Sequence, residues 1–418
     1  MAAEHQQSAY DVVIIGGGPA GLAAGMALRQ CGISRVLIVE REAEAGGIPR
    51  HCNHPPFGIR EYGRLMTGPA YASWSVARAL ALGVVIRTRA TVVGLEPDCR
   101  VRLATEKGMD EVVGKRVLLC LGARERPRAA HLIGGTRPIG VLNTSTLQQA
   151  VNLKQLRPFQ RPLIVGTELV SLSSILTCRH AGISPVAMIE RAPRPMARWP
   201  LSLLPRLVGI PLLLGTELVA IEGKEQVESV WLRAQNGAMR QLVCDGVLLT
   251  GSFTPESALP LMSGLAIDSG TGGPVVDQYG RCANPRYYAA GNLLRPIETA
   301  GWCWREGRRV GAFIAQDLAA GLPLPERKIK LQVDAPLTYV MPQILYPEHD
   351  HEIELQLRIA RPVKARLVAV QAGKELASKQ GYFKPERRIL LKLPAGLRGD
   401  APIEIRLSPG AGEHNEGA

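Results

Sequence analysis

A glycine-rich turn near the start of the chain constrains its fold more than any other feature. An apolar strand over Asp11–Ile15 runs directly into Gly16, Gly18 and Gly21, which have the spacing G-x-G-x-x-G. The first glycine allows a tight turn, the second lets backbone approach a pyrophosphate, and the third lets helix and strand pack closely. The next strand ends in Glu40, whose carboxylate can accept hydrogen bonds from a ribose diol. The pattern predicts a dinucleotide-binding βαβ unit.

Three later segments favour a flavin dinucleotide. Gly46–Gly47 follow the acidic end of the second strand (residues 36–39), and residues 117–127 form an apolar strand with a turn. Near residue 300 a third segment, residues 287–318, predicts a strand, a turn at Gly291–Asn292 and a helix over residues 299–318. A late strand, turn and helix can return to the first domain and hold the flavin end of FAD.

A second turn repeats this layout with two of its glycines replaced. The stretch "RPLIVGTELVS" runs from a strand over Leu163–Val165 into a helix over residues 168–181, with Gly166, Glu168 and Ser171 at the three motif positions. A side chain at the second position blocks the backbone approach that a pyrophosphate needs. The carboxylate of Glu168 would also repel phosphate at the helix N-terminus. The turn therefore predicts a dinucleotide-binding fold with impaired NAD(P) binding.

The order of these segments resembles the FAD-dependent pyridine-nucleotide-disulfide oxidoreductase-like flavoproteins over residues 10 to about 322. One branch is indicated, that of the large flavin subunits of hydrogen cyanide synthase, opine oxidase and D-hydroxyproline dehydrogenase and their stand-alone relatives. The stretches that carry this resemblance are "GGIPRHCNHPPFG", "MTGPAYA", "LGARERPRAA", "VGTELVSLS", "GPVVDQYGRCANP" and "AAGNLLRPIETAGWCWREGRRVG".

The resemblance implies an α/β fold with two Rossmann-like domains, the second inserted into the first, and the C-terminal sequence itself predicts a small antiparallel β domain. The expected limits are residues 10–127 and 256–322 for the discontinuous FAD-binding domain and 128–255 for the NAD(P)-like domain. A β module over 325–410 and a flexible tail over 411–418 follow. The module is expected from period-two alternation in stretches such as "HEIELQLRIA" and "PIEIRLSP".

The resemblance also assigns residues to the cofactor. The first turn would hold the ADP half of FAD, Gly122 would lie near the adenosine, and Gly291–Asn292 would meet the ribityl chain or pyrophosphate. The helix after Thr299 would point its positive end at the flavin N1–O2 edge. The expected FAD-binding set is Gly16, Gly18, Pro19, Ala20, Gly21, Glu40, Arg41, Gly47, Gly122, Gly291, Asn292, Thr299 and Ala300.

Candidate catalytic residues are His51, His54 and Cys303. Histidine is a suitable base near neutral pH. Two interpretations stay open for His51 and His54: a loop that faces the flavin, or loop packing without a chemical role. Cys52 stands between them without a partner cysteine, so an internal dithiol is disfavoured. A metal site is disfavoured because the loop lacks a second pair of ligands. Around Cys303, aromatic core packing is favoured over a substrate wall, and Glu306 is expected to cap the helix or form an ion pair.

Composition restricts the remaining possibilities. The net charge is +13, but lysine and arginine are dispersed, which argues against nucleic acid and fits a solvated surface or an acidic partner. The apolar window Trp199–Ile221 is interrupted by prolines and glycines, so it is a poor transmembrane span, while a surface-lying segment stays open. The polar first ten residues do not predict a signal peptide. We expect a cytoplasmic protein.

No cysteine follows Cys303, so we expect no cysteine-held 2Fe–2S domain in the last part of this chain. The leading hypothesis is one subunit of an FAD-dependent dehydrogenase or oxidase that acts on an amine, imino acid or hydroxy acid and uses a non-NAD acceptor. Expected partners are a small-molecule substrate, a separate electron-transfer protein and a second flavoprotein subunit. The alternatives are an NAD(P)H-dependent flavoprotein reductase and a non-catalytic FAD-binding subunit of a heteromeric flavoenzyme.

Overall fold

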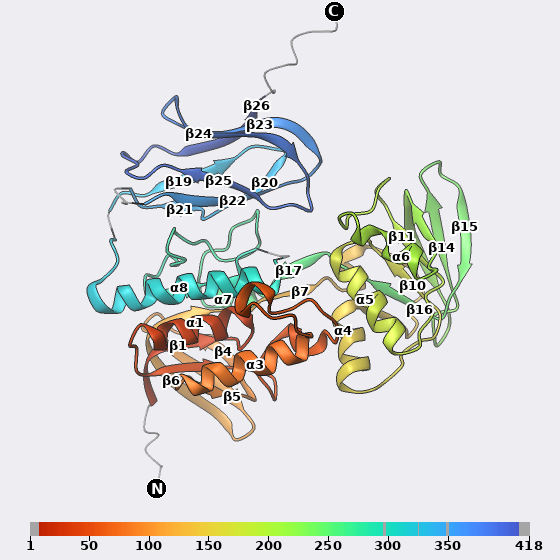
Figure 1. The fold of residues 1–418 in the computed structure, drawn as a ribbon, viewed down its shortest axis with the longest axis horizontal. Helices are drawn as coiled ribbons and strands as arrows, with labels where there is room; N and C mark the ends of the chain where they lie inside the picture. The colour runs from red at the N-terminus through yellow and green to blue at the C-terminus, as the bar shows by residue number, and fades with distance from the viewer. Residues whose placement is uncertain (1–7, 296–297, 325, 348–350, 409–418) are drawn as a thin grey trace, which may run out of the picture. The chain divides into compact units, whose positions relative to one another are not determined.

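The computed structural model describes residues 8–295, 298–324, 326–347 and 351–408, and the expected tail 411–418 lies outside the described residues. The chain divides into two compact units (Figure 1). The segment Gly46–Trp74 groups with the second unit, although the sequence resemblance places it in the FAD-binding domain. The first unit comprises residues 1–45, 75–122 and 255–418, and the second comprises 46–74 and 123–254.

A seven-stranded sheet forms the centre of the first unit. Its order is β3-β2-β1-β6-β5-β4, and β18 also pairs with β6. The pairs among β1, β2, β3, β6 and β18 are parallel, and β4 and β5 are antiparallel to their neighbours. The bounds are β1 Ser8–Ile15, β2 Val36–Val39, β3 Val85–Arg87, β4 Ala90–Leu95, β5 Arg100–Thr105, β6 Gly108–Leu119 and β18 Tyr287–Ala289. The expected strands before the first turn, before Glu40 and near residue 287 are therefore confirmed.

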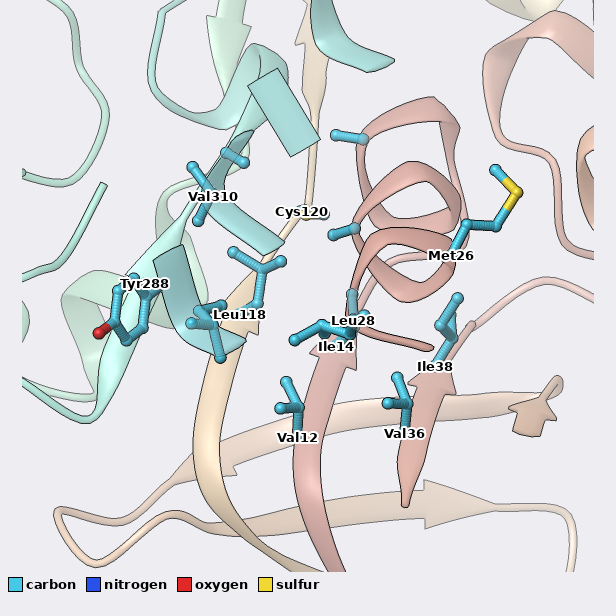
Figure 2. Close-up of a cluster of buried hydrophobic side chains, with 14 of the residues drawn as sticks. Val12, Ile14, Met26, Leu28, Val36, Ile38, Leu118, Cys120, Tyr288 and Val310 are labelled. Atoms are coloured by element: carbon cyan, nitrogen blue, oxygen red, sulfur yellow. The ribbon is translucent and has the colours of Figure 1, made fainter. Parts of the chain in front are cut away.

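Alternate residues of the central strands enter two separate cores. Val12 and Ile14 of β1 face one side and pack with Leu118, Tyr288 and Val310, whereas the intervening valine and isoleucine face the other side (Figure 2). Both sides are buried, as expected for parallel strands covered on each face. The helical elements within this unit are α1 Pro19–Gln30, α7 Ala258–Met262, the turn η5 Gly291–Leu293 and α8 Ala300–Ala320. Helix α3, Gly68–Ala81, begins in the second unit and ends in the first.

Helices α1 and α8 meet through glycine. A Cβ on Gly307 would lie 2.1 Å from the carbonyl oxygen of Ala20, and one on Gly311 would lie 2.8 Å from that of Ala24. Two helix backbones can approach this closely only where no side chain separates them. This contact holds α8 against α1, the helix that follows the first glycine turn. Strand β18 and helix α8 therefore belong to the same domain as α1, although they lie far from it in the sequence.

The second unit contains another parallel sheet, in the order β12-β11-β10-β16-β9, and a four-stranded sheet, β15-β14-β13-β8. Helix α5, Leu169–His180, connects β10 to β11, so the predicted second strand–turn–helix–strand is confirmed. The strands are β7 Ala123–Glu125, β8 Gly134–Gly135, β9 Val141–Asn143, β10 Pro162–Val165, β11 Ala187–Glu190, β12 Leu212–Leu214, β13 Thr216–Glu222, β14 Ser229–Ala234, β15 Met239–Val243, β16 Gly246–Leu249 and β17 Phe253–Pro255, the last pairing with β7. The short helices are η1 Ile48–His51, α2 Ile59–Tyr62, η2 Arg128–His131, α4 Thr144–Gln148, the π-helical turn η3 Gln149–Leu153, η4 Leu201–Leu203 and α6 Leu204–Leu207.

The C-terminal strands form two sheets around their own apolar core, as the alternating pattern predicts. The orders are β21-β19-β26-β23-β24 and β20-β22-β25. The expected antiparallel arrangement holds with one exception, because β19 and β26 pair in parallel. The bounds are β19 Ile329–Val333, β20 Leu337–Met341, β21 Ile344–Leu345, β22 Ile353–Ile359, β23 Val363–Gln371, β24 Lys374–Phe383, β25 Ile389–Leu393 and β26 Ile403–Ser408.

The contact between α1 and α8 predicts the effect of one methyl group. Gly307→Ala should lower stability by about 1–3 kcal/mol, because overpacking outweighs the better helix propensity of alanine. The measurement is the free energy of unfolding in urea. Gln316→Ala on the exposed face of α8 is the matched control and should be near neutral. A Gly307→Ala protein as stable as the control would contradict the tight packing.

Candidate functional site

The first glycine turn lies at the carboxyl ends of β1 and β6. A Cβ on Gly16 would lie 2.4 Å from the carbonyl oxygen of Cys120, and one on Gly21 would lie 2.0 Å from that of Gly16. Gly16 also has a φ of +106°, which side chains rarely allow. Both positions therefore require glycine, Gly16 for the tight turn and Gly21 for the close packing of helix and strand.

The N-terminus of α1 completes this turn. Gly18 is the N-cap residue with extended backbone, Pro19 follows it, and the first helical turn carries no acidic side chain. The first backbone N–H groups of a helix have no acceptor within the helix, and the helix dipole favours an anion beside them. The turn therefore fits the phosphates of a dinucleotide in both shape and charge.

Glu40 links the turn to the end of β2. It is only 7% exposed; its Oε2 accepts a hydrogen bond from the Gly17 N–H at 2.8 Å, and its Oε1 accepts one from the Glu42 N–H at 2.9 Å. Each carboxylate oxygen has a further lone pair. Glu40 can thus fix the turn and still accept a bond from a ribose hydroxyl.

The remaining predicted cofactor residues lie at other turns. Arg41 is exposed beside Glu42, and Gly47 and Gly122 adopt positive φ, +64° and +74°. Gly47 precedes η1 in the second unit. Gly122 follows β6 and is the last residue of the 75–122 segment of the first unit. Their contact with a cofactor stays a prediction.

The late turn is held by a buried ion pair that the sequence indicated only in part. Gly291 donates its N–H to Glu306 Oε2 at 2.8 Å, and Arg295 Nη1 lies 3.0 Å from the same carboxylate. Glu306 is 6% exposed and Arg295 1%. The expected ion-paired role of Glu306 is confirmed. Arg295 was missed; the only signal was a charged residue directly after the apolar stretch that ends at Leu294.

Asn292 organises the loop before α8. Its Oδ1 accepts a hydrogen bond from the Glu298 N–H at 2.8 Å, and its Nδ2 donates to the Glu298 carbonyl at 3.1 Å. Thr299 is then the N-cap of α8, whose first turn carries no acidic side chain. The Asn292 side chain therefore positions the helix start, and its predicted contact with a ribityl chain stays a prediction.

The Glu298 side chain connects this loop to the C-terminal sheets. Its carboxylate lies 3.5 Å from Arg358 and 3.7 Å from Arg388. The Arg388 guanidinium lies 3.9 Å from the ring centroid of Trp302, so this tryptophan packs against a cation. These partners are distant in sequence, and no local pattern indicates them.

Cys303 lies on the first turn of α8 and is buried. Burial, with the nearby carboxylate of Glu306, raises the pKa of its thiol to about 12. The thiol is therefore protonated at neutral pH and weakly nucleophilic. Its catalytic role stays a prediction.

The histidine–cysteine loop forms a row of polar contacts within the second unit. His54 Nε2 lies 2.5 Å from Ser173 Oγ, and Gln148 Nε2 donates to the same oxygen at 2.7 Å. Cys52 Sγ in turn lies 3.4 Å from Gln148 Oε1, and burial raises its pKa to about 12. His51 is buried, and its carbonyl accepts a bond from Asn152. The structure thus brings His54 and Cys52 to the ends of one row.

The second glycine turn is filled by its own side chains. Glu168 Oε2 accepts a hydrogen bond from Ser171 Oγ at 3.0 Å and a weaker one from Thr250 Oγ1 at 3.4 Å. The Glu168 carboxylate lies 2.6 Å from where a Cβ on Gly166 would be and 2.8 Å from where one on Gly251 would be. It therefore occupies the surface over the ends of β10 and β16. Burial raises the pKa of Glu168, and the charge of Glu190 adds to this effect.

Glu190 corresponds to Glu40 and is engaged in a different way. Its Oε2 accepts a bond from Thr167 Oγ1 at 2.5 Å, and its Oε1 accepts one from the Ala192 N–H at 2.9 Å. In the first turn, backbone of Gly17 donates the equivalent bond. The second turn therefore replaces one of the two backbone contacts with a side-chain contact and keeps the other.

Among the described residues, no group of three or more histidine, cysteine, aspartate or glutamate side chains could hold a metal ion. Within the same residues, no helix is long and apolar enough to cross a membrane.

The chain has two domains of the dinucleotide-binding type, and the first combines an intact glycine turn with the late helix α8. This combination defines the fold class of two-domain flavoprotein reductases. Residues 10–307 match the model of the pyridine nucleotide-disulphide oxidoreductases. The chain belongs to this family, and its expected fold class is confirmed. Family membership indicates a flavin cofactor.

Two curated relatives carry the name of an opine oxidase subunit. That of Agrobacterium tumefaciens (strain Ach5) is 29% identical over 323 residues, which cover 68% of this chain and 61% of the relative. That of Rhizobium meliloti (strain 1021) is 27% identical over 187 residues, covering 44% and 39%. The chain thus spans less than two thirds of the curated relatives it matches.

Solved structures show the same fold at low identity. T. acidophilum thioredoxin reductase superposes with a TM-score of 0.64 at 20% identity, covering 75% of this chain and 100% of that one. L-proline dehydrogenase from P. horikoshii gives a TM-score of 0.55 at 21% identity, covering 76% and 57%.

The geometry of Glu40 predicts its contribution to cofactor retention. Glu40→Ala leaves buried N–H groups without an acceptor, which costs about 1–3 kcal/mol, and removes the ribose acceptor. We expect the affinity for flavin to fall roughly tenfold or more. The measurement is the amount of flavin that remains bound per chain after dialysis. Glu42→Ala, an exposed neighbour whose backbone N–H remains, is the control. Equal flavin content in the two variants would exclude Glu40 from the site.

The raised pKa of Glu168 predicts a pH dependence of stability. In the unfolded chain a glutamate titrates near about pH 4.3, so the folded state holds this proton more tightly. The stability contributed by the protonated group is complete below that pH and is lost as pH rises through the folded pKa. Glu168→Gln should therefore gain in Tm relative to the wild type as pH increases.

The measurement follows the Tm of both proteins from about pH 4 upward, starting below the pKa of a glutamate in the unfolded chain. Glu225→Gln changes an exposed carboxylate of the same unit and should show no such trend. A Glu168→Gln difference that stays constant or shrinks with rising pH would contradict the burial of this charge.

Proposed function

We propose that this chain is an FAD-dependent oxidoreductase, one subunit of a dehydrogenase or oxidase that oxidises an amine, imino acid or hydroxy acid. We further propose that the electrons pass to an acceptor other than NAD(P). The observation that carries this proposal is the contrast between the two glycine turns. The first offers bare backbone and an acid-free helix N-terminus, whereas the second is covered by the Glu168 carboxylate.

FAD is proposed as the flavin because the first turn has the parts that an ADP moiety needs. Gly16 and Gly21 allow the tight turn and the close helix packing, Gly18 has no side chain to obstruct a pyrophosphate, and Glu40 retains an acceptor for the ribose. The Gly291 turn and the start of α8 would form the second part of the cofactor-binding site. Glu306 and Arg295 hold this turn in place.

The names of the relatives support the type of reaction and the multi-subunit assembly that we propose. Two curated proteins that match the chain are called opine oxidase subunits, which favours an oxidase or dehydrogenase built from more than one kind of chain. A separate electron-transfer protein and a second flavoprotein subunit remain the proposed partners.

A flavin held by the first glycine turn and the start of α8 would supply the hydride acceptor for such an oxidation, while the proton on the substrate nitrogen or oxygen leaves separately. The start of α8 would favour negative charge on a reduced ring by about 0.3–2 kcal/mol, because its first turn carries no acidic side chain. His51 and His54 remain the proposed proton acceptors, because an imidazole is a suitable base near neutral pH.

Anaerobic reduction tests this proposal. The flavin-loaded protein is mixed with NADH, with NADPH, or with a panel of secondary amines, imino acids and hydroxy acids, and its absorbance is followed near about 450 nm, where oxidised flavins absorb. Bleaching by a panel member and slow or no bleaching by the nicotinamides is the expected result. Rapid bleaching by NADH or NADPH would instead establish an NAD(P)H-dependent reductase. A flavin that no substrate or partner reduces would establish a non-catalytic subunit.

Restoring the second turn supplies a further prediction. Glu168→Gly with Ser171→Gly recreates the three-glycine spacing after β10, so reduction by NADH should accelerate roughly tenfold or more, since a phosphate regains access to the helix N-terminus. Glu168→Gln keeps the covering side chain and is the control. If the double variant responds to NADH no better than the control, the carboxylate is not what excludes the nucleotide.

A further inference from the structure

An exposed apolar segment of the second unit follows Met196 and Ala197, whose N–H groups bond to Thr167 of the second glycine turn. It covers residues 198–207, from Arg198 through η4 and α6 to Leu207. Trp199 is 79% exposed and Leu207 78%, while Leu201 and Leu203 are 51% and 37% exposed. Large apolar side chains gathered so closely on a surface mark a site of interaction.

The segment is fixed to the core beneath it. Pro205 is buried, and the partly buried Leu204 and Val208 pack against the core that contains Ile175. The backbone is bonded internally: the Ser202 N–H donates to the Arg198 carbonyl at 3.0 Å, and the Val208 N–H donates to the Leu204 carbonyl at 3.1 Å. The exposed apolar side chains are therefore presented by a folded element.

The charged residues of the segment and its sequence flanks are all arginines. Between residues 191 and 215 the sequence contains four arginines, at 191, 194, 198 and 206, and no aspartate or glutamate. Arg198 and Arg206 are exposed within the segment itself. Acidic groups of neighbouring strands approach the start of this stretch: Glu217 on β13 lies 3.9 Å from Arg191, and Glu190 on β11 accepts a bond from the Ala192 N–H at 2.9 Å.

We propose that residues 198–207 form a peripheral binding surface for an anionic lipid bilayer. Tryptophan and leucine enter the boundary between headgroups and acyl chains, and arginines at the same level pair with lipid phosphates. An apolar surface that carries exposed arginines matches this environment, because anionic headgroups complement the charge and acyl chains cover the apolar side chains. The surface lies on the membrane and does not span it.

The proposal is independent of the flavin chemistry. It goes beyond the proposed function by supplying a location, since a protein held at a bilayer can deliver electrons to an acceptor dissolved in that bilayer. Vesicle binding does not require turnover, so failure of either proposal leaves the other intact.

Co-sedimentation with vesicles tests the surface. The full chain, loaded with flavin, is mixed with vesicles of phosphatidylcholine alone or of phosphatidylcholine with about 30% phosphatidylglycerol, at low salt. We expect binding to the anionic vesicles and at least a roughly tenfold weaker association with the neutral ones. The double variant Trp199→Ser/Leu207→Ser should lose roughly tenfold or more of the anionic binding.

Two further variants separate the contributions. Arg198→Glu/Arg206→Glu should abolish the preference for anionic vesicles. Leu132→Ser/Met262→Ser removes apolar side chains that are 90% and 79% exposed elsewhere, and should bind as the wild type does. All four substituted apolar residues are exposed, so the variants should fold, which circular dichroism verifies.

Several outcomes would overturn the proposal. Wild-type protein that stays in the supernatant with both kinds of vesicle excludes a lipid surface. Undiminished binding by Trp199→Ser/Leu207→Ser would indicate adsorption by dispersed charge alone. If that variant instead converts an oligomer into a monomer in analytical ultracentrifugation, without a change in vesicle binding, then a second copy of the chain covers the segment.

Discussion

The contact between α1 and α8 is the constraint on which the first domain depends. Gly307 and Gly311 let the late helix reach the carbonyl groups of Ala20 and Ala24, and residues close to 300 thereby join a domain that begins near residue 10. A Cβ on Gly291 would lie 2.9 Å from the Cβ of Ala20, so the late turn also reaches the first helix. The two halves of the proposed cofactor site are thus placed by backbone contact, which tolerates little displacement.

The two glycine turns show how one fold can retain or lose a ligand seat. Both follow a parallel strand, and both are closed by a glutamate at the end of the next strand. In the first, Glu40 binds the backbone of Gly17; in the second, Glu190 binds the hydroxyl of Thr167. Glu168 in turn accepts bonds from Ser171 and Thr250, so these polar side chains of the second turn bond to one another. The architecture is therefore preserved by hydrogen bonds that require no nucleotide.

Local patterns were sufficient to predict the strands, the turns, the late helix and the period-two C-terminal strands, because each depends on residues adjacent in sequence. The sequence also indicated that Glu168 would obstruct the second turn. It did not indicate the parallel pairing of β19 with β26, since alternation of apolar residues specifies a face and not a direction. Nor did it reveal Arg358 and Arg388 as partners of Glu298, because that contact joins loops and strands about sixty to ninety residues apart.

The Glu298 cluster ties the C-terminal sheets to the late turn through charge. Arg295, Glu298 and Glu306 lie on the turn and helix, and Arg358 and Arg388 come from the sheets. If the sheets separated, Glu298 would lose both arginines and its compensation for burial, which is costly for an ion. Local opening of the sheets is therefore opposed by the turn itself. The two parts should melt as one cooperative block, and the C-terminal module is in this sense a thermodynamic extension of the flavoprotein domain.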